Sequence, residues 1–274
     1  MKKLLHNIRH RISIILLTFK MTIQSQMEYP SFLVGWLLAN PFQFGFGILG
    51  IFIIVSNFGA IGDWGFQEIA FLYGISAVSH GLTIVLFIQT WYIESSVRYG
   101  ELDRYMLRPL GVFFQMIPSY INLIGFTDML PGLIILIYGC IKIGFDASFF
   151  NILKLIITIA GAVLIRGGIY LFSGSISFYT KSSSSLIELD SRLFDSASMY
   201  PVSIYPSWIQ ILFTYLFPIA FISFYSAREF LGKTDGLPMF GNAYLITFLV
   251  GLLVFFLAFL FFKRGLSKYE SSGS

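Results

Sequence analysis

Six long apolar stretches constrain this 274-residue chain more than any other feature. A helix that crosses a bilayer needs about 20 mainly apolar residues, because the hydrocarbon core is about 30 Å thick. Backbone polar groups in that core must be satisfied internally, which favours helices. We therefore predict an all-α integral membrane protein. The expected membrane-spanning helices cover residues 32–56, 68–92, 119–141, 152–177, 208–225 and 241–262.

The composition agrees with a membrane protein and narrows its chemistry. Only 12% of the residues are charged, against about 25% in typical soluble domains. We treat residues 31–274 as a single transmembrane domain. The one cysteine, Cys140, excludes an intramolecular disulfide and a multi-cysteine metal site. The sequence contains neither an HExxH metal motif nor a GxSxG nucleophile motif, so we expect no metal and no enzyme activity.

Lysine and arginine residues predict the orientation of the chain. If the N-terminus is inside, 13 of the 18 basic residues fall in the inner segments. Those segments are residues 1–31, 93–118, 178–207 and 263–274. Cytoplasmic loops carry such an excess, so both termini are expected in the cytoplasm. Because the basic residues flank apolar runs, they indicate a lipid bilayer and not nucleic acid as the partner.

The first 30 residues favour an amphipathic helix on the inner leaflet, although a solvated basic tail is the alternative. Their apolar residues recur at helical spacing, whereas most of their basic residues fall on other faces. The apolar positions are Leu4, Ile8, Ile12, Ile15, Phe19, Ile23 and Met27.

The segment between the second and third apolar runs is highly charged for this chain. Glu94 and Arg98 have the i,i+4 spacing that weakly supports a helix, as do Glu101 and Arg104 at i,i+3. We expect Gly100 to break the segment. Pro109 is expected to end it. An apolar stripe is formed by Leu102, Tyr105, Met106 and Pro109. Two interpretations remain: a helix that docks a soluble partner, or an interfacial helix that only turns the chain.

A second inner segment covers residues 181–201 and includes four consecutive serines. Ser185 and Glu188 have the spacing of a capping box, which predicts a short helix over residues 186–198. We interpret it mainly as a connector between spans, with contact to the same partner as the alternative.

Two charged residues, Asp128 and Arg166, fall inside predicted spans. A charge at mid-bilayer costs about 2.5–3.5 kcal/mol on insertion scales, so each should have a partner or water. Both lie at similar depth in consecutive spans, and consecutive elements are usually neighbours. We therefore predict an Asp128–Arg166 ion pair, structural in role, with substrate binding as the alternative.

Two stretches of sequence resemble a known family. GELDRYMLRPL (residues 100–110) is similar to a signature of ATP-binding-cassette (ABC) type-2 exporter permeases, in particular their small six-span bacterial branch. Residues 200–232 resemble a second pattern of that branch, although Ser226 stands where the pattern has proline and Phe230 where it often has leucine. The matching positions are Pro201, Ile204, Tyr205, Pro206, Pro218, Ala220, Phe221, Tyr225, Leu231 and Gly232.

The resemblance implies partners and site residues. A second permease, identical or homologous, and two cytoplasmic ATP-binding subunits would complete the transporter in a bacterial cytoplasmic membrane. ATP and Mg²⁺ would bind to those subunits, and this chain would bind no cofactor. Residues 1–30 would form the connecting helix. The coupling helix, which those subunits push, would comprise Arg98, Gly100, Glu101, Leu102, Asp103, Arg104, Tyr105, Met106, Leu107, Arg108 and Pro109. Short re-entrant helices at an outer gate would include Pro218, Tyr225, Phe230, Leu231 and Gly232.

These inferences together predict an ABC exporter permease that moves an amphipathic or hydrophobic substrate. Three alternatives stay open on the residues alone. They are a non-transporting membrane scaffold, an intramembrane enzyme, and an ion-coupled carrier that uses Asp128, His80 and Arg166.

Overall fold

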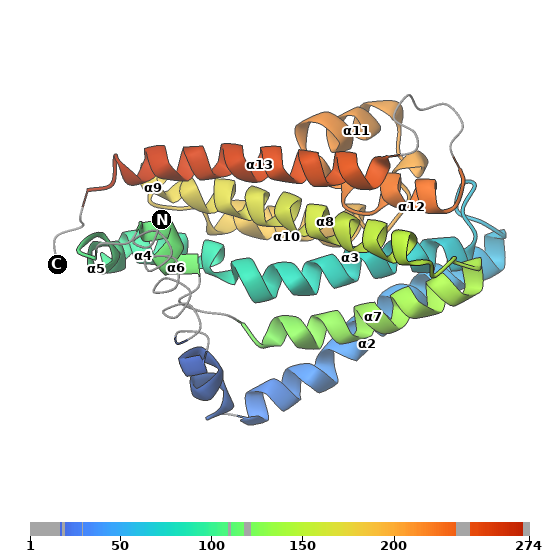
Figure 1. Ribbon diagram of the computed structural model, residues 1–274, viewed down its shortest axis with the longest axis horizontal. Coiled ribbons are helices and arrows are strands. Elements are labelled where there is room, and N and C mark those ends of the chain that lie inside the picture. Colours follow the sequence, from blue (N-terminus) through green and yellow to red (C-terminus); the bar gives the residue numbers. More distant parts are fainter. Residues whose placement is uncertain are drawn as a thin grey trace.

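The structure is a computed structural model that describes residues 17, 20–28, 30–108, 111–117, 122–233 and 242–270. Every regular element in these ranges is a helix, as the sequence predicts. Figure 1 shows an elongated bundle in which α3, α7, α8 and α13 run along the long axis and α2 slants away below α7.

Within the described residues, five helices are long and apolar enough to cross a membrane. They correspond to five of the six predicted spans, with ends shifted by a few residues. Their bounds are α2 (Pro30–Phe58), α3 (Phe66–Phe87), α7 (Ile124–Ile143), α8 (Phe149–Ser175) and α13 (Ala243–Leu266). Helix α3 continues through a 3₁₀ turn, η1 (Ile88–Tyr92), into α4 (Ile93–Arg98).

Helix α3 lies in the middle of the bundle, between α7 and α8, and α13 packs on the other side of α8 (Figure 1). Glycine allows the closest of these contacts. A Cβ atom added to Gly81 of α3 would lie 2.7 Å from the carbonyl oxygen of Gly125 in α7. A Cβ atom on Gly161 of α8 would lie 2.8 Å from the Cα of Phe248 in α13. These backbones approach closely because small residues line the helix contacts, as is common in membrane bundles.

Short helices gather at one end of the bundle, which we call the α5 end (left in Figure 1). It contains α4, α5 (Glu101–Met106), α6 (Val112–Met116), α9 (Ser177–Thr180) and the C-terminal end of α13. The opposite end, which we call the α12 end, contains α12 (Phe224–Phe230) and the turns between α2 and α3 and between α7 and α8.

The predicted fifth span, residues 208–225, is not one straight helix. It comprises α11 (Ser207–Ile211), the π-helix η4 (Leu212–Leu216), the 3₁₀ turn η5 (Ile219–Phe221) and the start of α12. The two halves, Ser207–Leu216 and Ile219–Phe230, are bent by 80°. The break contains Pro218, whose ring cannot continue a helix without loss of a backbone hydrogen bond.

The second inner segment forms a short helix, as predicted, but it packs on α8 and is therefore more than a connector between spans. Helix α10 (Ser184–Ala197) starts at the α5 end and runs beside α8 (Figure 1). Its buried side chains, Ile187, Asp190, Phe194 and Ala197, repeat at helical spacing. The predicted capping box is wrong, since Ser183 is the N-cap and no side chain of α10 caps it. After α10, the 3₁₀ turn η3 (Val202–Ile204) leads to α11.

Most of the predicted N-terminal amphipathic helix lies outside the described residues. Residues 20–27 are helical. The side-chain oxygen of Gln26 accepts a hydrogen bond from the backbone N–H of Leu123 at 2.9 Å. The end of this helix therefore contacts the start of α7.

Candidate functional site

The short helix α5 is held against the bundle by one face. Gly100 has φ 71°, a left-handed conformation that separates α4 from α5, as predicted. Leu102 is fully buried and Tyr105 is 9% exposed, in an apolar cluster with Ile93 of α4 and Phe262 of α13. The predicted stripe for a soluble partner is therefore wrong at Leu102 and Tyr105, because these side chains pack inside this chain. The helix ends at Met106, and Pro109 lies outside the described residues.

The other face of α5 and the turns on each side of it are exposed. Leu107 is 88% exposed and Tyr99 is 70% exposed. The guanidinium of Arg104 lies 5.5 Å from the ring centre of Tyr105. Glu101 accepts a hydrogen bond from the Ser96 hydroxyl at 3.1 Å, and the expected Glu101–Arg104 pair is not among the ion pairs of the described residues. The exposed side chains are Arg98, Tyr99, Glu101, Arg104, Met106, Leu107 and Arg108, with Asp103 half-buried. They form a mixed charged and apolar surface, which we call the α5 surface.

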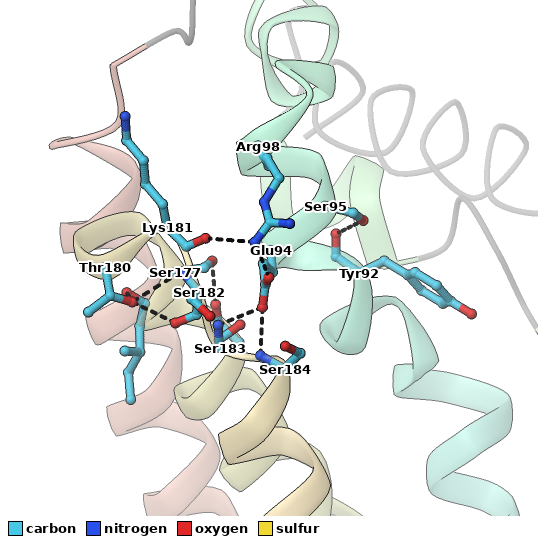
Figure 2. Close-up of polar contacts among 12 residues, drawn as sticks. Tyr92, Glu94, Ser95, Arg98, Ser177, Thr180, Lys181, Ser182, Ser183 and Ser184 are labelled. Atoms are coloured by element: carbon cyan, nitrogen blue, oxygen red, sulfur yellow. Dashed lines mark hydrogen bonds and ion pairs between the residues drawn. The ribbon is translucent and has the colours of Figure 1, made fainter.

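Glu94 connects this region to α10, as Figure 2 shows. One carboxylate oxygen, Oε2, accepts backbone N–H groups of Ser183 and Ser184, both at 2.6 Å. The other, Oε1, lies 2.7 Å from Nη2 of Arg98, which confirms the predicted i,i+4 pair. Arg98 also contacts the carbonyl oxygen of Lys181 at 3.5 Å. Glu94 thus caps a helix about 90 residues away, a role that the local sequence does not reveal because only the i,i+4 spacing is visible there.

A left-handed turn directs the chain into α10. Lys181 has φ 58°, the one positive φ of a non-glycine residue in the described chain. This conformation is uncommon for a side chain with a Cβ atom. Thr180 Oγ1 donates a hydrogen bond to the carbonyl oxygen of Ser182 at 2.6 Å, within the same turn (Figure 2). The turn places the N–H groups of Ser183 and Ser184 on the Glu94 carboxylate.

The structure does not bring Asp128 and Arg166 together. The guanidinium of Arg166, 1% exposed, donates to the hydroxyls of Ser76 and Ser198 at 2.8 Å each. It also lies 4.8 Å from the ring centre of Phe194. Asp128 accepts a hydrogen bond from the side-chain amide of Asn40 in α2. The predicted ion pair is wrong because α3 lies between α7 and α8, so these consecutive spans are not neighbours.

This arrangement also leaves the three residues of the ion-carrier hypothesis without a common network. Asp128 contacts α2, whereas Arg166 contacts α3 and α10. The Nδ1 atom of His80 has no hydrogen-bond partner within the described chain. Among the described residues, no hydrogen bond or ion pair therefore joins Asp128, His80 and Arg166 into one proton path.

The residues assigned to an outer gate lie in the bent segment near the α12 end. The hydroxyl of Tyr225 is 2.9 Å from that of Thr214, so it joins the two halves of the bend. Phe230 packs on Phe71, with ring centres 5.8 Å apart. Leu231 follows the last turn of α12, and Gly232 ends it with φ 67°. Tyr225 and Phe230 lie in α12, Pro218 lies at the bend, and Leu231 and Gly232 follow α12. The outer gate itself remains a prediction.

The bundle of long apolar helices defines a multi-pass helical membrane protein. Residues 43–273 match the family described as "ABC-2 family transporter protein". The chain therefore belongs to the ABC-2 transporter family, and membership implies a permease that works with an ATP-binding subunit. A comparison with curated proteins gave no significant sequence match.

Proposed function

We propose that this chain is the permease of an ABC exporter and that α5 is its coupling helix. Hydrolysis of ATP on separate subunits drives an amphipathic or hydrophobic substrate out of the cytoplasm. The observation that carries the proposal is the two-faced environment of α5. One face is buried through Leu102 and Tyr105, while the α5 surface is exposed at the end of the bundle.

This environment suits a helix that receives force. A displacement applied to an exposed helix moves the bundle only if the helix is firmly packed on it. Leu102 has no exposed area, and its cluster includes residues of α4, α6, α8 and α13. The α5 surface offers a partner both charged groups and the exposed apolar side chains of Met106 and Leu107.

The distribution of basic residues supports a cytoplasmic location for the α5 end. Exposed basic side chains gather there, as the positive-inside rule expects for the cytoplasmic side of a membrane. They are Arg98, Arg104, Arg108, Lys181, Lys263, Arg264 and Lys268. In the proposed assembly both termini are cytoplasmic, residues 1–30 form the connecting helix, and the membrane is the bacterial cytoplasmic membrane.

The complete transporter contains two such permeases, identical or homologous, and two ATP-binding subunits, which hold ATP and Mg²⁺. The substrate moves between the permeases. The exposed apolar surface of α2 is consistent with an amphipathic or hydrophobic substrate. Its exposed side chains include Phe42, Phe46 and Phe58, at 66%, 70% and 80% exposure. Lipid contact alone also accounts for part of this apolar surface.

The test is co-purification with a candidate ATP-binding subunit, followed by substrate-stimulated ATP hydrolysis in lipid vesicles. The double variant Arg104→Glu, Leu107→Glu alters only exposed side chains, so it should insert and fold normally. We expect it to lose binding to the ATP-binding subunit or to lose stimulated hydrolysis. Lys142→Glu, a charge reversal near the α12 end, is the matched control.

The same assay separates the alternative functions. A scaffold would bind the subunit without substrate-stimulated hydrolysis. An ion-coupled carrier would stop when ion gradients are dissipated, whereas the exporter would continue. If the Arg104→Glu, Leu107→Glu variant shows normal substrate-stimulated ATP hydrolysis, α5 is not the coupling helix.

A further inference from the structure

We infer that α10 transmits the movement of α5 into the bundle, and that Glu94 is the positioning residue that joins the two. This inference rests on the proposed function, in which the ATP-binding subunits move α5. It assigns a role to contacts that the family match does not explain, and it gives a route from the α5 surface to the bent segment at residues 207–230.

The first step of the route is the cap that Glu94 provides. The first turn of a helix has backbone N–H groups without partners inside the helix, and its dipole favours a negative charge there. No side chain of α10 itself caps its N-terminus. Glu94 of α4 supplies the carboxylate instead, with two hydrogen bonds of 2.6 Å. Such charge-assisted bonds are among the strongest in proteins, so the N-terminus of α10 is fixed to α4.

The second step is the rigid connection between Glu94 and α5. Ile93 and Val97 of α4 share one apolar cluster with Leu102 and Tyr105 of α5. The Ser96 hydroxyl donates to the carboxylate of Glu101, which adds a polar contact between the two helices. Because α4 and α5 pack as one unit, a displacement of the α5 surface also displaces the Glu94 carboxylate. The N-terminus of α10 then follows.

The third step lies at the other end of α10. Its 14 residues extend about 21 Å at 1.5 Å per residue. The C-cap residue, Ser198, receives a hydrogen bond from the buried guanidinium of Arg166 at 2.8 Å. The carbonyl oxygen of Ser198 accepts a hydrogen bond from the Ser223 hydroxyl at 2.8 Å, and Ser223 immediately precedes α12. Movement of α10 therefore acts on the bent segment that carries the residues assigned to the gate.

A second route leaves α5 through the apolar cluster to Phe178 and Phe262, and so to α13. The two routes differ in their dependence on Glu94. If α10 carries the movement, removal of the carboxylate cap interrupts coupling although every side chain of the α5 surface is retained and only Arg98 loses its ion pair. If α13 carries it, the loss of the cap leaves coupling unchanged.

The experiment uses the full permease, assembled with its ATP-binding subunit in lipid vesicles. Glu94→Leu removes both hydrogen bonds to α10, whereas Glu94→Gln keeps a side-chain oxygen that accepts backbone N–H groups. We expect Glu94→Leu to assemble normally and to retain basal ATP hydrolysis. Its substrate-stimulated hydrolysis should fall by about fivefold or more, which is the lower range of energetic coupling between sites. Glu94→Gln should recover most of the stimulation.

Glu188→Leu is the matched control. Glu188 forms an i,i+4 pair with Arg192 at 2.6 Å on the exposed face of α10, but it caps no helix. This variant removes a glutamate and an ion pair and should keep full stimulation. Hydrogen exchange of the backbone amides of residues 183–187 gives a readout that does not depend on ATP. It should increase in Glu94→Leu and stay unchanged in Glu188→Leu.

Three outcomes would contradict the inference. If Glu94→Leu keeps full substrate-stimulated ATP hydrolysis while its amide exchange at residues 183–187 is faster, the movement does not pass through α10. Unchanged exchange would show that Glu94 does not fix this helix. If Glu94→Gln and Glu94→Leu lose the same share of substrate-stimulated ATP hydrolysis, coupling depends on the charge of Glu94 and not on its hydrogen bonds to α10. If the wild-type assembly shows no stimulation by substrate, the proposed function fails, and this inference fails with it.

Discussion

Glu94 and Arg166 lie at opposite ends of α10 and carry opposite charges. The carboxylate contacts the first backbone N–H groups of the helix, and the guanidinium contacts the hydroxyl of its C-cap residue, Ser198. Both charges interact favourably with the helix dipole, because the negative charge lies at the N-terminus and the positive charge at the C-terminus. Because the two residues come from α4 and α8, a polar helix is held against an apolar bundle by groups that it does not itself contain.

Arg166 gives the first prediction. A carboxylate in its place would put a negative charge at the C-terminus of α10, beside a hydroxyl that already donates to the carbonyl oxygen of Phe194. We expect Arg166→Glu to lower the free energy of unfolding by about 3–5 kcal/mol, the cost of an uncompensated buried charge. Arg166→Met should cost less, because Ser76 and Ser198 can still bond to each other at 2.7 Å. Thermal unfolding in detergent measures both variants, and equal midpoints would contradict this account.

The apolar packing of α5 gives the second prediction. Leu102→Ala empties a fully buried site and should destabilise the protein by about 2–5 kcal/mol. Leu107→Ala, at a position 88% exposed, should change stability by about 0.5 kcal/mol or less. The measurement is again the unfolding midpoint, now compared with binding of the ATP-binding subunit. If Leu102→Ala is as stable as the wild type but fails to bind the ATP-binding subunit, Leu102 contacts that subunit directly and this account is wrong.

Asp128 and Arg166 provide the third prediction. Since they contact different helices, the effects of Asp128→Asn and Arg166→Met on stability should add within about 0.5 kcal/mol in a double-mutant cycle. The pair Asp128→Asn and Asn40→Ala should instead show coupling, because these side chains share a hydrogen bond. Strong coupling between Asp128 and Arg166 would mean that the ion pair exists after all.

Close helix contact gives the fourth prediction. A Cβ atom on Gly125 would lie 2.6 Å from the backbone nitrogen of Val85, so Gly125→Ala must push α7 away from α3. We expect a loss of about 1–3 kcal/mol, as for other overpacked sites. Gly45→Ala is the control, because a Cβ atom there meets nothing within 4 Å. In α2 this change should be neutral or stabilising by up to about 1 kcal/mol. An equal loss in both variants would exclude the packing explanation.

The amino-acid sequence alone determined the long helices and several local features of this protein. The length of each apolar run specified α2, α3, α7, α8 and α13, since a bilayer-crossing helix needs a minimum number of apolar residues. Gly100 and the i,i+4 spacing of Glu94 and Arg98 specified the break and the ion pair near α5. These features depend on residues a few positions apart, so their signal is contained in the local sequence.

Tertiary structure decided what α10, Glu94 and Arg166 do. Helix α10 has a polar composition that suits a surface connector, yet one face of it is buried along α8. Glu94 caps it across 89 and 90 positions of sequence, and α3 separates the two helices that carry Asp128 and Arg166. Local periodicity shows which face of a helix is apolar but not which helix will cover it. That choice follows from packing of the whole bundle. Close glycine contacts place α3 against α7, while Arg166 of α8 bonds to Ser76 of α3 and to Ser198 at the end of α10.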